Sequence, residues 1–193
     1  MTEITNTIVN SIENNKCVLI LGPDLYLKEF EGKIIEKKKC FSDIEKEIPN
    51  GIYFPEEDVF DFNPLYRRSI KNRIFEFFSG EGDIKLYELI ASVRFPLILN
   101  VSPDSALKDF CDVNGITLQF ESFHGFNDEN NSINFGSDNA LLYNLFGNSK
   151  DLQELIIDHK QLFKHIQKIL PEHSLPLSIR QHLSNANCFI FLG

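Results

Sequence analysis

The sequence predicts an α/β protein whose parallel sheet is covered by helices on both faces. Uninterrupted apolar runs at residues 17–21 and 97–101 are typical of strands buried on both sides, as in a parallel sheet. Amphipathic helical segments separate the apolar runs, so strands and helices alternate along the chain. With 193 residues, of which 42% are hydrophobic, the chain can form one domain with a substantial core.

Periodicity and turn residues assign the elements in chain order. A helix with isoleucines at a spacing of four precedes the first strand. A loop-rich region with short helices follows at residues 28–66. The later helices are predicted at residues 70–78, 84–95, 102–115, 158–170 and 176–185. The later strands are predicted at residues 97–101, 116–120, 141–146 and 188–193, with a polar surface loop at 123–139.

Two helices carry recognisable start signals. Ser102 and Pro103 match an N-cap followed by proline at the first helical position. Asp158 matches an N-cap with Gln161 at the capping-box position. These signals predict that the two helices begin at residues 102 and 158.

We expect a single domain over residues 1–193, with a helical and loop insert at residues 28–95. The sequence ends one residue after a predicted buried strand, where a doubly wound domain would place a covering helix. We therefore expect the natural protein to continue into a C-terminal domain. The alternative is a protected edge strand at a true chain end.

Charge and composition restrict the expected partners and location. The net charge of −9 and the pI of about 5.0 argue against a duplex-binding surface, so nucleic acid is not an expected partner. The basic run at residues 37–39 is interpreted as a solvated turn. We interpret the basic and aromatic segment 67–78 as a packed helix or a contact surface. Scattered cysteines, no signal peptide and no apolar run of ~20 residues predict a cytoplasmic protein without a membrane or metal site.

Three predicted strand ends carry the residues of a candidate site. Ligands bind open α/β sheets beyond the carboxyl ends of the strands. These ends are Gly22-Pro23-Asp24-Leu25-Tyr26, Ser102-Pro103-Asp104 and Phe146-Gly147. Their order, followed by an apolar strand that ends in Gly193, resembles the sirtuin-like domains of bacterial defence proteins. In that family a Gly-Ala-Gly-x-Ser turn, an Asn-x-Asp motif and a His-Gly motif follow one another.

The resemblance implies a Rossmann-like, sirtuin-like fold with NAD as cofactor. In the family, the glycine turn approaches the pyrophosphate. The Asn positions the nicotinamide ribose or the attacking water, and the His acts as general base. The cofactor-binding positions that this implies here are Gly22, Pro23, Asp24, Ser102, Asp104 and Gly147.

The side chains that carry the family's chemistry are replaced in this sequence. Ser102 stands in place of the Asn, and Phe146 in place of the His, so no general base remains there. Pro23 removes a backbone N–H donor from the turn. Asp24 brings a carboxylate toward the pyrophosphate position, where like charges at ~4 Å cost on the order of 4 kcal/mol.

Other polar residues offer alternatives for the missing groups. Asn100 either imitates the missing Asn or makes a simple strand-end hydrogen bond. His124, in the His-Gly pair of the polar loop, is either a relocated catalytic group or a loop residue. Asn144 shares a strand face with Phe146, so it either approaches the cleft or is a polar strand-end residue. The remaining histidines of the predicted helices are interpreted as surface residues: His159, His165 and His182.

Three hypotheses follow for the function. The first, which we prefer, is a catalytically degenerate sirtuin-like module for assembly, interaction or sensing in a bacterial defence or signalling protein. It would act through a protein partner, a C-terminal effector domain of the same chain, or self-association. The second is an active NAD⁺ glycohydrolase that uses Asn100 or His124. The third is a sensor that binds NAD or ADP-ribose without turnover.

Overall fold

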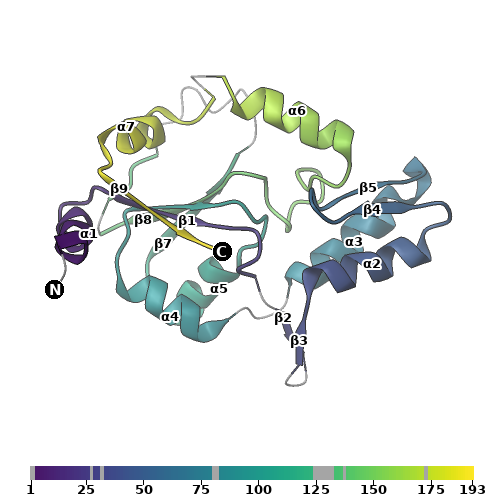
Figure 1. Cartoon of the computed structure of the whole chain (residues 1–193), viewed down its shortest axis with the longest axis horizontal. Helices are drawn as coiled ribbons and strands as arrows, with labels where there is room; N and C mark the ends of the chain where they lie inside the picture. Colours follow the sequence, from purple (N-terminus) through teal and green to yellow (C-terminus); the bar gives the residue numbers. More distant parts are fainter. Residues whose placement is uncertain are drawn as a thin grey trace.

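The fold is built on a five-stranded, fully parallel sheet in the order β7-β8-β6-β1-β9 (Figure 1). The computed structural model describes residues 3–26, 28–30, 33–79, 83–123, 133–136, 138–171 and 174–193. The strands of the sheet are β1 (Cys17–Leu21), β6 (Leu97–Asn100), β7 (Leu118–Ser122), β8 (Ala140–Asn144) and β9 (Cys188–Leu192). The predicted α/β fold with a Rossmann-like parallel sheet is confirmed.

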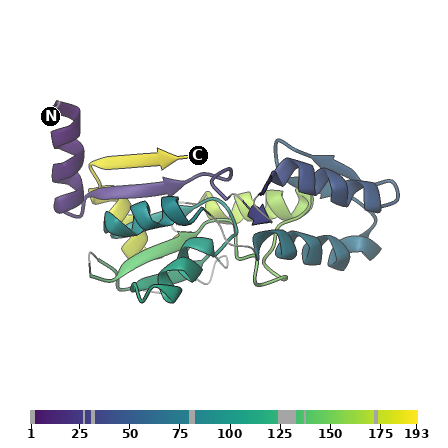
Figure 2. The same ribbon diagram turned by 90° about the horizontal axis from the view of Figure 1, so that it is seen from below.

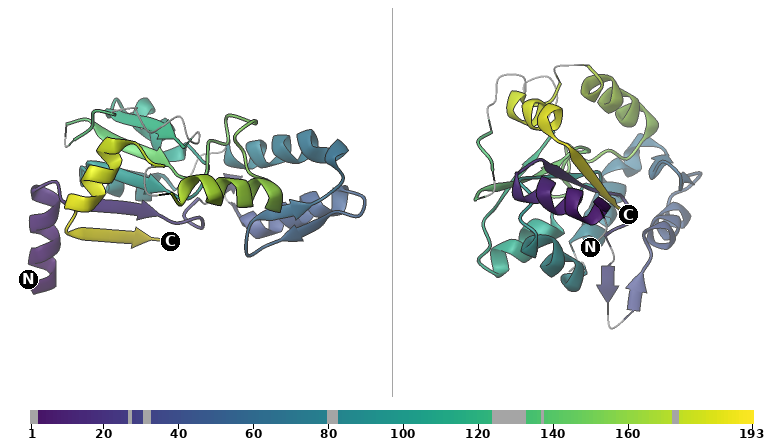
Figure 3. Two further views of the ribbon diagram at one scale, coloured as in Figure 1. Left: turned by 90° about the horizontal axis from the view of Figure 1, so that it is seen from above. Right: turned by 60° about the vertical axis from the view of Figure 1, so that its left-hand side comes forward.

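Helices cover both faces of this sheet, as expected. Figures 1 and 3 show α4 (Ile84–Ser92) and α5 (Ala106–Val113) on one side and α6 (His159–Ile169) and α7 (Leu177–Asn185) on the other. A further helix, α1 (Glu3–Glu13), stands beside the beginning of β1. None of the helices within the described ranges is long and apolar enough to cross a bilayer.

The central strands are continuous apolar runs because each face packs into its own core. On β1, Leu19 joins the core beneath α4 and α5, whereas Val18 joins the core beneath α7. On β6, Ile98 joins the core beneath α4 and α5, and Leu97 joins the core beneath α7. Burial on both sides explains why neither strand shows a polar-apolar alternation.

The segment between β1 and α4 contains more regular structure than the loop-rich prediction for residues 28–66. Two small antiparallel pairs form there, joining β2 to β3 and β4 to β5. The elements are β2 (Lys28–Phe30), β3 (Lys33–Ile35), α2 (Lys37–Glu47), β4 (Ile52–Phe54), β5 (Val59–Asp61), the 3₁₀ turn η1 (Pro64–Tyr66) and α3 (Arg67–Phe78). Three-residue strands are too short to leave a clear alternation in the sequence.

The elements α2, α3, β4 and β5 form a lateral unit beside the carboxyl ends of the sheet (Figures 1 and 2). The α3 helix buries Ile70, Ile74, Phe77 and Phe78, which confirms its interpretation as a packed helix. The α4 helix, which falls within the predicted insert of residues 28–95, lies beside α5 and packs on the sheet.

One of the two predicted helix starts is wrong. The α5 helix begins at Ala106, not at Ser102 and Pro103. The N–H of Ser102 is taken by the Oδ1 atom of Asn100 at 3.0 Å, so the strand ends in a local side-chain turn before any helix can start. The other start is confirmed, since Asp158 caps α6 by accepting a 2.7 Å hydrogen bond from the N–H of Gln161.

Candidate functional site

The three sequence motifs meet at the carboxyl edge of the sheet. The adjacent strands β6 and β8 lead into α5 and α6, which lie on opposite faces of the sheet. Open α/β sheets bind ligands at the point where such a reversal occurs. The residue after β8 is joined to the last residue of β6 by a 2.8 Å hydrogen bond from Leu145 N–H to Asn100 O. Val101 N–H likewise donates to Leu21 O at 2.9 Å, which brings in the turn after β1.

The side-chain NH₂ groups of the buried amides at this edge donate to the protein itself, whereas the Oδ1 atom of Asn144 and the hydroxyl of Ser102 have no hydrogen-bond partner in the described structure. The Nδ2 atoms of Asn100 and Asn144 both donate to the main-chain oxygen of Asp104, at 3.4 and 2.8 Å. Both side chains are buried. Asn100 and Asn144 were each expected either to serve the ligand site or to make a hydrogen bond at the end of a strand. Their contacts match the strand-end hydrogen bond.

Asp104 is also used within the loop. Its carboxylate accepts a 3.0 Å hydrogen bond from the N–H of Ala106 at the start of α5. Burial raises the pKa of Asp104, and the polar groups of Ser102 and Ala106 oppose this rise. The acidic residue of the second motif thus orders the strand-to-helix connection.

The glycine of the first motif packs against a strand. Gly22 N–H donates to Leu192 O at 2.7 Å, so this backbone donor is engaged by β9. A Cβ atom at this position would lie 3.1 Å from the same oxygen. Glycine at position 22 therefore allows β9 to pack close to the turn after β1.

The space beside this glycine is filled by the protein's own side chains. A cavity of only about 10 Å³ remains there, bounded by Gly22, Asn100 and Asp104 and by Tyr26 and Tyr87. Tyr26 is buried, and its hydroxyl donates to Phe77 O at 3.0 Å. The turn after β1 is in this way fastened to α3.

The interpretation of the basic run at residues 37–39 as a solvated turn is wrong for Lys37. Residues 37–39 open α2, and the Lys37 side chain is only 9% exposed. Its Nζ atom lies 2.5 Å from the Asp58 carboxylate and 3.5 Å from that of Asp24, and it donates to Pro23 O at 3.1 Å. The ammonium group therefore neutralises Asp24 and joins the turn after β1 to the β4–β5 turn.

A larger cleft of about 300 Å³ lies between the sheet edge and the lateral unit. Pro23, Ser102 and Phe146 line its sheet side. Its other walls are mainly apolar, and its charged residues are one lysine and three carboxylates: Lys37, Glu56, Glu57 and Asp58. This excess of negative charge is unfavourable for a phosphate group.

The imidazole of His165 lies against the Phe146 ring. The His165 ring on α6 is centred 4.9 Å from that of Phe146, and its Nε2 atom lies 2.7 Å from Leu145 O. Burial lowers the pKa of His165. His165 is therefore not a surface residue, and that interpretation is wrong. Its spacing of three and four residues from Leu162 and Ile169 places it on the packed face of the helix, and this spacing could have predicted its position from the sequence.

Two other histidines also contact aromatic rings. His159 packs edge-on against Phe54, and His182 against Phe135, so neither is a simple surface residue. His124 lies outside the described residues. Within the described part of the chain, no three His, Cys, Asp or Glu side chains gather into a metal site.

No protein-family model and no curated protein matches this chain. The likeness to sirtuin-like domains therefore depends on the order of its motifs.

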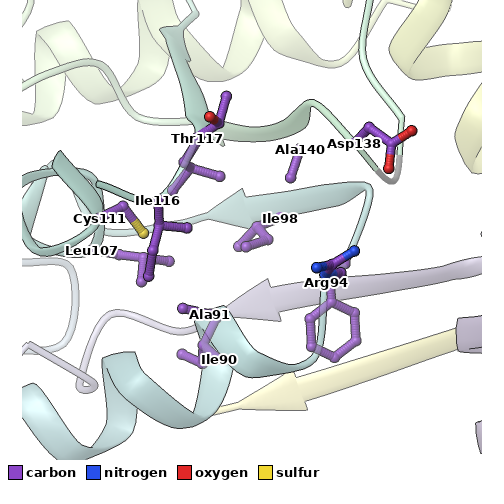
Figure 4. A pocket seen from close by; sticks show the side chains of 12 residues that line it. Ile90, Ala91, Arg94, Ile98, Leu107, Cys111, Ile116, Thr117, Asp138 and Ala140 are labelled. Carbon is purple, nitrogen blue, oxygen red and sulfur yellow. The ribbon is translucent and has the colours of Figure 1, made fainter. Parts of the chain in front are cut away.

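Another cavity lies at the opposite edge of the sheet. It has a volume of about 440 Å³, lies where β6, β7 and β8 begin, and is lined by α4 and α5 (Figure 4). Ile98, Leu107 and Ile116 form apolar walls, while Arg94 and Asp138 contribute the charged groups. None of the three motifs contributes to this cavity.

Proposed function

We propose that this chain is a catalytically degenerate, sirtuin-like module that acts by assembly or protein interaction within a bacterial defence or signalling protein. The observation that carries the proposal is the small space beside Gly22, where the cavity bordered by Tyr26 and Tyr87 has a volume of about 10 Å³. The cleft of about 300 Å³ at the same sheet edge is lined by Phe146 and by three carboxylates. An NAD-cleaving enzyme needs room for its substrate beside the glycine turn, and a proton acceptor and phosphate donors at this edge.

The polar groups of the crevice support the same conclusion. Hydrolysis of NAD requires donors for the pyrophosphate and a positioned group for water or ribose. The N–H of Gly22 bonds to Leu192, and the amides of Asn100 and Asn144 bond to Asp104. Phe146 offers no proton acceptor. His165 stacks beside Phe146, but its Nε2 atom is engaged by a main-chain oxygen.

The exposed apolar side chains of β9 support a role in protein–protein interaction. Phe189 and Phe191 on β9 are 44% and 71% exposed, beside a sheet edge with no neighbouring strand in the described structure. Exposed apolar surface of this kind marks contact sites for other protein surfaces.

A second candidate function is ligand sensing without turnover. The 300 Å³ cleft at the sheet edge favours it, because a volume of this size suits a small organic molecule. The carboxylates in the cleft favour a ligand without phosphate groups over NAD or ADP-ribose.

Calorimetry with NAD and ADP-ribose, run beside an assay of nicotinamide release, tests the proposal. We expect neither heat of binding nor release from the full chain. Binding without release would replace the assembly role with the sensor. Release that is lost in Asn100→Ala or His124→Ala, with the fold retained by circular dichroism, would establish an active hydrolase.

A further inference from the structure

The β9 strand presents two different faces. Cys188, Ile190 and Leu192 pack on the core shared with α4 and α5, whereas Phe189 and Phe191 project on the other face and remain exposed. Figure 2 shows β9 as the outermost strand of the sheet, paired on one side with β1. Its outer edge meets no other strand among the residues that the structure describes.

The free hydrogen-bonding groups of this edge belong to the two phenylalanines. Cys188 N–H donates to Lys16 O at 3.1 Å, and Leu192 O accepts from Gly22 N–H at 2.7 Å. In a parallel pair, alternate residues direct both backbone groups to the same neighbour. The N–H and C=O groups of Phe189 and Phe191 therefore point outward, away from β1.

Nothing in the sequence of this edge prevents pairing. Sheet edges are commonly blunted by lysine, other charges, proline or bulges. Residues 181–193 contain no Asp, Glu, Lys, Arg or Pro. The net charge of −9 makes two copies repel each other over most of their surface, and a neutral strand is where this repulsion is weakest.

The strand is also complementary to itself. We propose that β9 pairs antiparallel with β9 of a second copy, about a two-fold axis at Ile190. This register sets Phe189 opposite Phe191 of the second copy, and Phe191 opposite its Phe189. All four outward N–H and C=O groups of each strand edge then find partners, and four phenyl rings cluster on one face.

The proposal rests on the proposed interaction function and specifies its partner and surface. Five-residue strands and two phenylalanines per copy bury much less than the ~1,600 Å² of a standard interface. Interfaces of this small size belong to weak complexes, so the dimer is expected to dissociate on dilution.

Sedimentation equilibrium across micromolar to submillimolar concentrations tests the pairing. The mass of the full chain should rise from 22.3 kDa toward twice this value. Phe191→Lys should remain a monomer throughout, because it places charges at the paired edge. Phe163→Lys is the matched control, since Phe163 on α6 is 63% exposed but remote from β9 in the fold, and it should dimerise like the parent chain.

Hydrogen exchange supplies a readout that needs no variant. Protection of the Phe189 and Phe191 amides should increase with protein concentration, whereas Ile190, whose amide faces β1, should be protected at every concentration. A monomer at all concentrations, equal dissociation by both lysine variants, or concentration-independent exchange of Phe191 overturns the pairing. Nicotinamide release would overturn the proposed function and leave the dimer measurement interpretable.

Discussion

The side-chain amide of Asn144 on β8 donates a 2.8 Å hydrogen bond to the main-chain oxygen of Asp104 beyond β6. This bond crosses the point where the two strands lead to opposite faces of the sheet. Asn144 is fully buried, and the more distant amide of Asn100 reaches the same oxygen. The contact therefore holds together the edge at which related folds open to a ligand.

Asn144→Ala should lower the free energy of unfolding by roughly 1–3 kcal/mol, because it leaves a buried carbonyl without its shorter hydrogen bond. Urea denaturation followed by circular dichroism measures the change. Asn10→Ala, at an exposed position of α1, is the control and should stay within about 0.5 kcal/mol. An equal effect of the two substitutions would show that the Asn144 bond contributes little.

Lys37→Met should destabilise the protein by about 1–2 kcal/mol, since it leaves Asp58 and Asp24 without their shared cation. The neighbouring Lys38→Met is a matched control. Lys38 is 57% exposed and lies 3.7 Å from the exposed Glu56 carboxylate, so its loss should cost under about 0.5 kcal/mol. Thermal unfolding at low and high salt checks both values, and similar losses for both lysines would contradict the structural role of Lys37.

His165 should make stability depend on pH. Burial lowers its pKa in the folded state below the ordinary value near 6.5, so the unfolded chain binds the proton more readily. This contribution to the free energy of unfolding is present above about pH 6.5 and is lost as the pH falls through the folded-state pKa.

His165→Gln removes this dependence while keeping a side-chain amide near Leu145 O. Urea denaturation from mildly alkaline to mildly acid pH should give a shallower decline in stability for the variant than for the parent chain. His182 is present in both proteins, so its titration cancels in the comparison. Parallel curves would mean that His165 does not set the acid sensitivity.

The sequence was sufficient for the central strands β1 and β6, but less so for β7 and β8. The β7 strand begins and ends two residues later than predicted, and β8 ends at Asn144, so Phe146 lies beyond the strand and does not share a strand face with Asn144. The β1 and β6 strands were predicted within one residue, because burial on both faces leaves an apolar run that no solvent-exposed segment would keep. The positions of Ser102 and Phe146 followed from strand order, since parallel strands end at the same edge.

What the sequence did not predict depends on contacts between distant segments. The buried position of Lys37 requires Asp58, which a separate hairpin brings beside it. The closure of the crevice by Tyr26 requires α3 and its Phe77 oxygen. The α5 helix starts later than predicted because a local turn competes with the helix for the same residues. Asn100 accepts a hydrogen bond from the N–H of Ser102, in the segment that resembled a helix cap.

The position of β1 between β6 and β9 has a consequence for how the chain is made. Cys17 pairs in register with Cys188, so β1, the first strand of the sheet in the sequence, has β9, the last strand, as one of its two neighbours. During synthesis from the N-terminus, one side of Val18 to Leu21 stays open until β9 has left the ribosome. Such distant pairing slows folding and exposes apolar backbone meanwhile. The open edge of the nascent β1 segment is therefore exposed to non-native strand pairing.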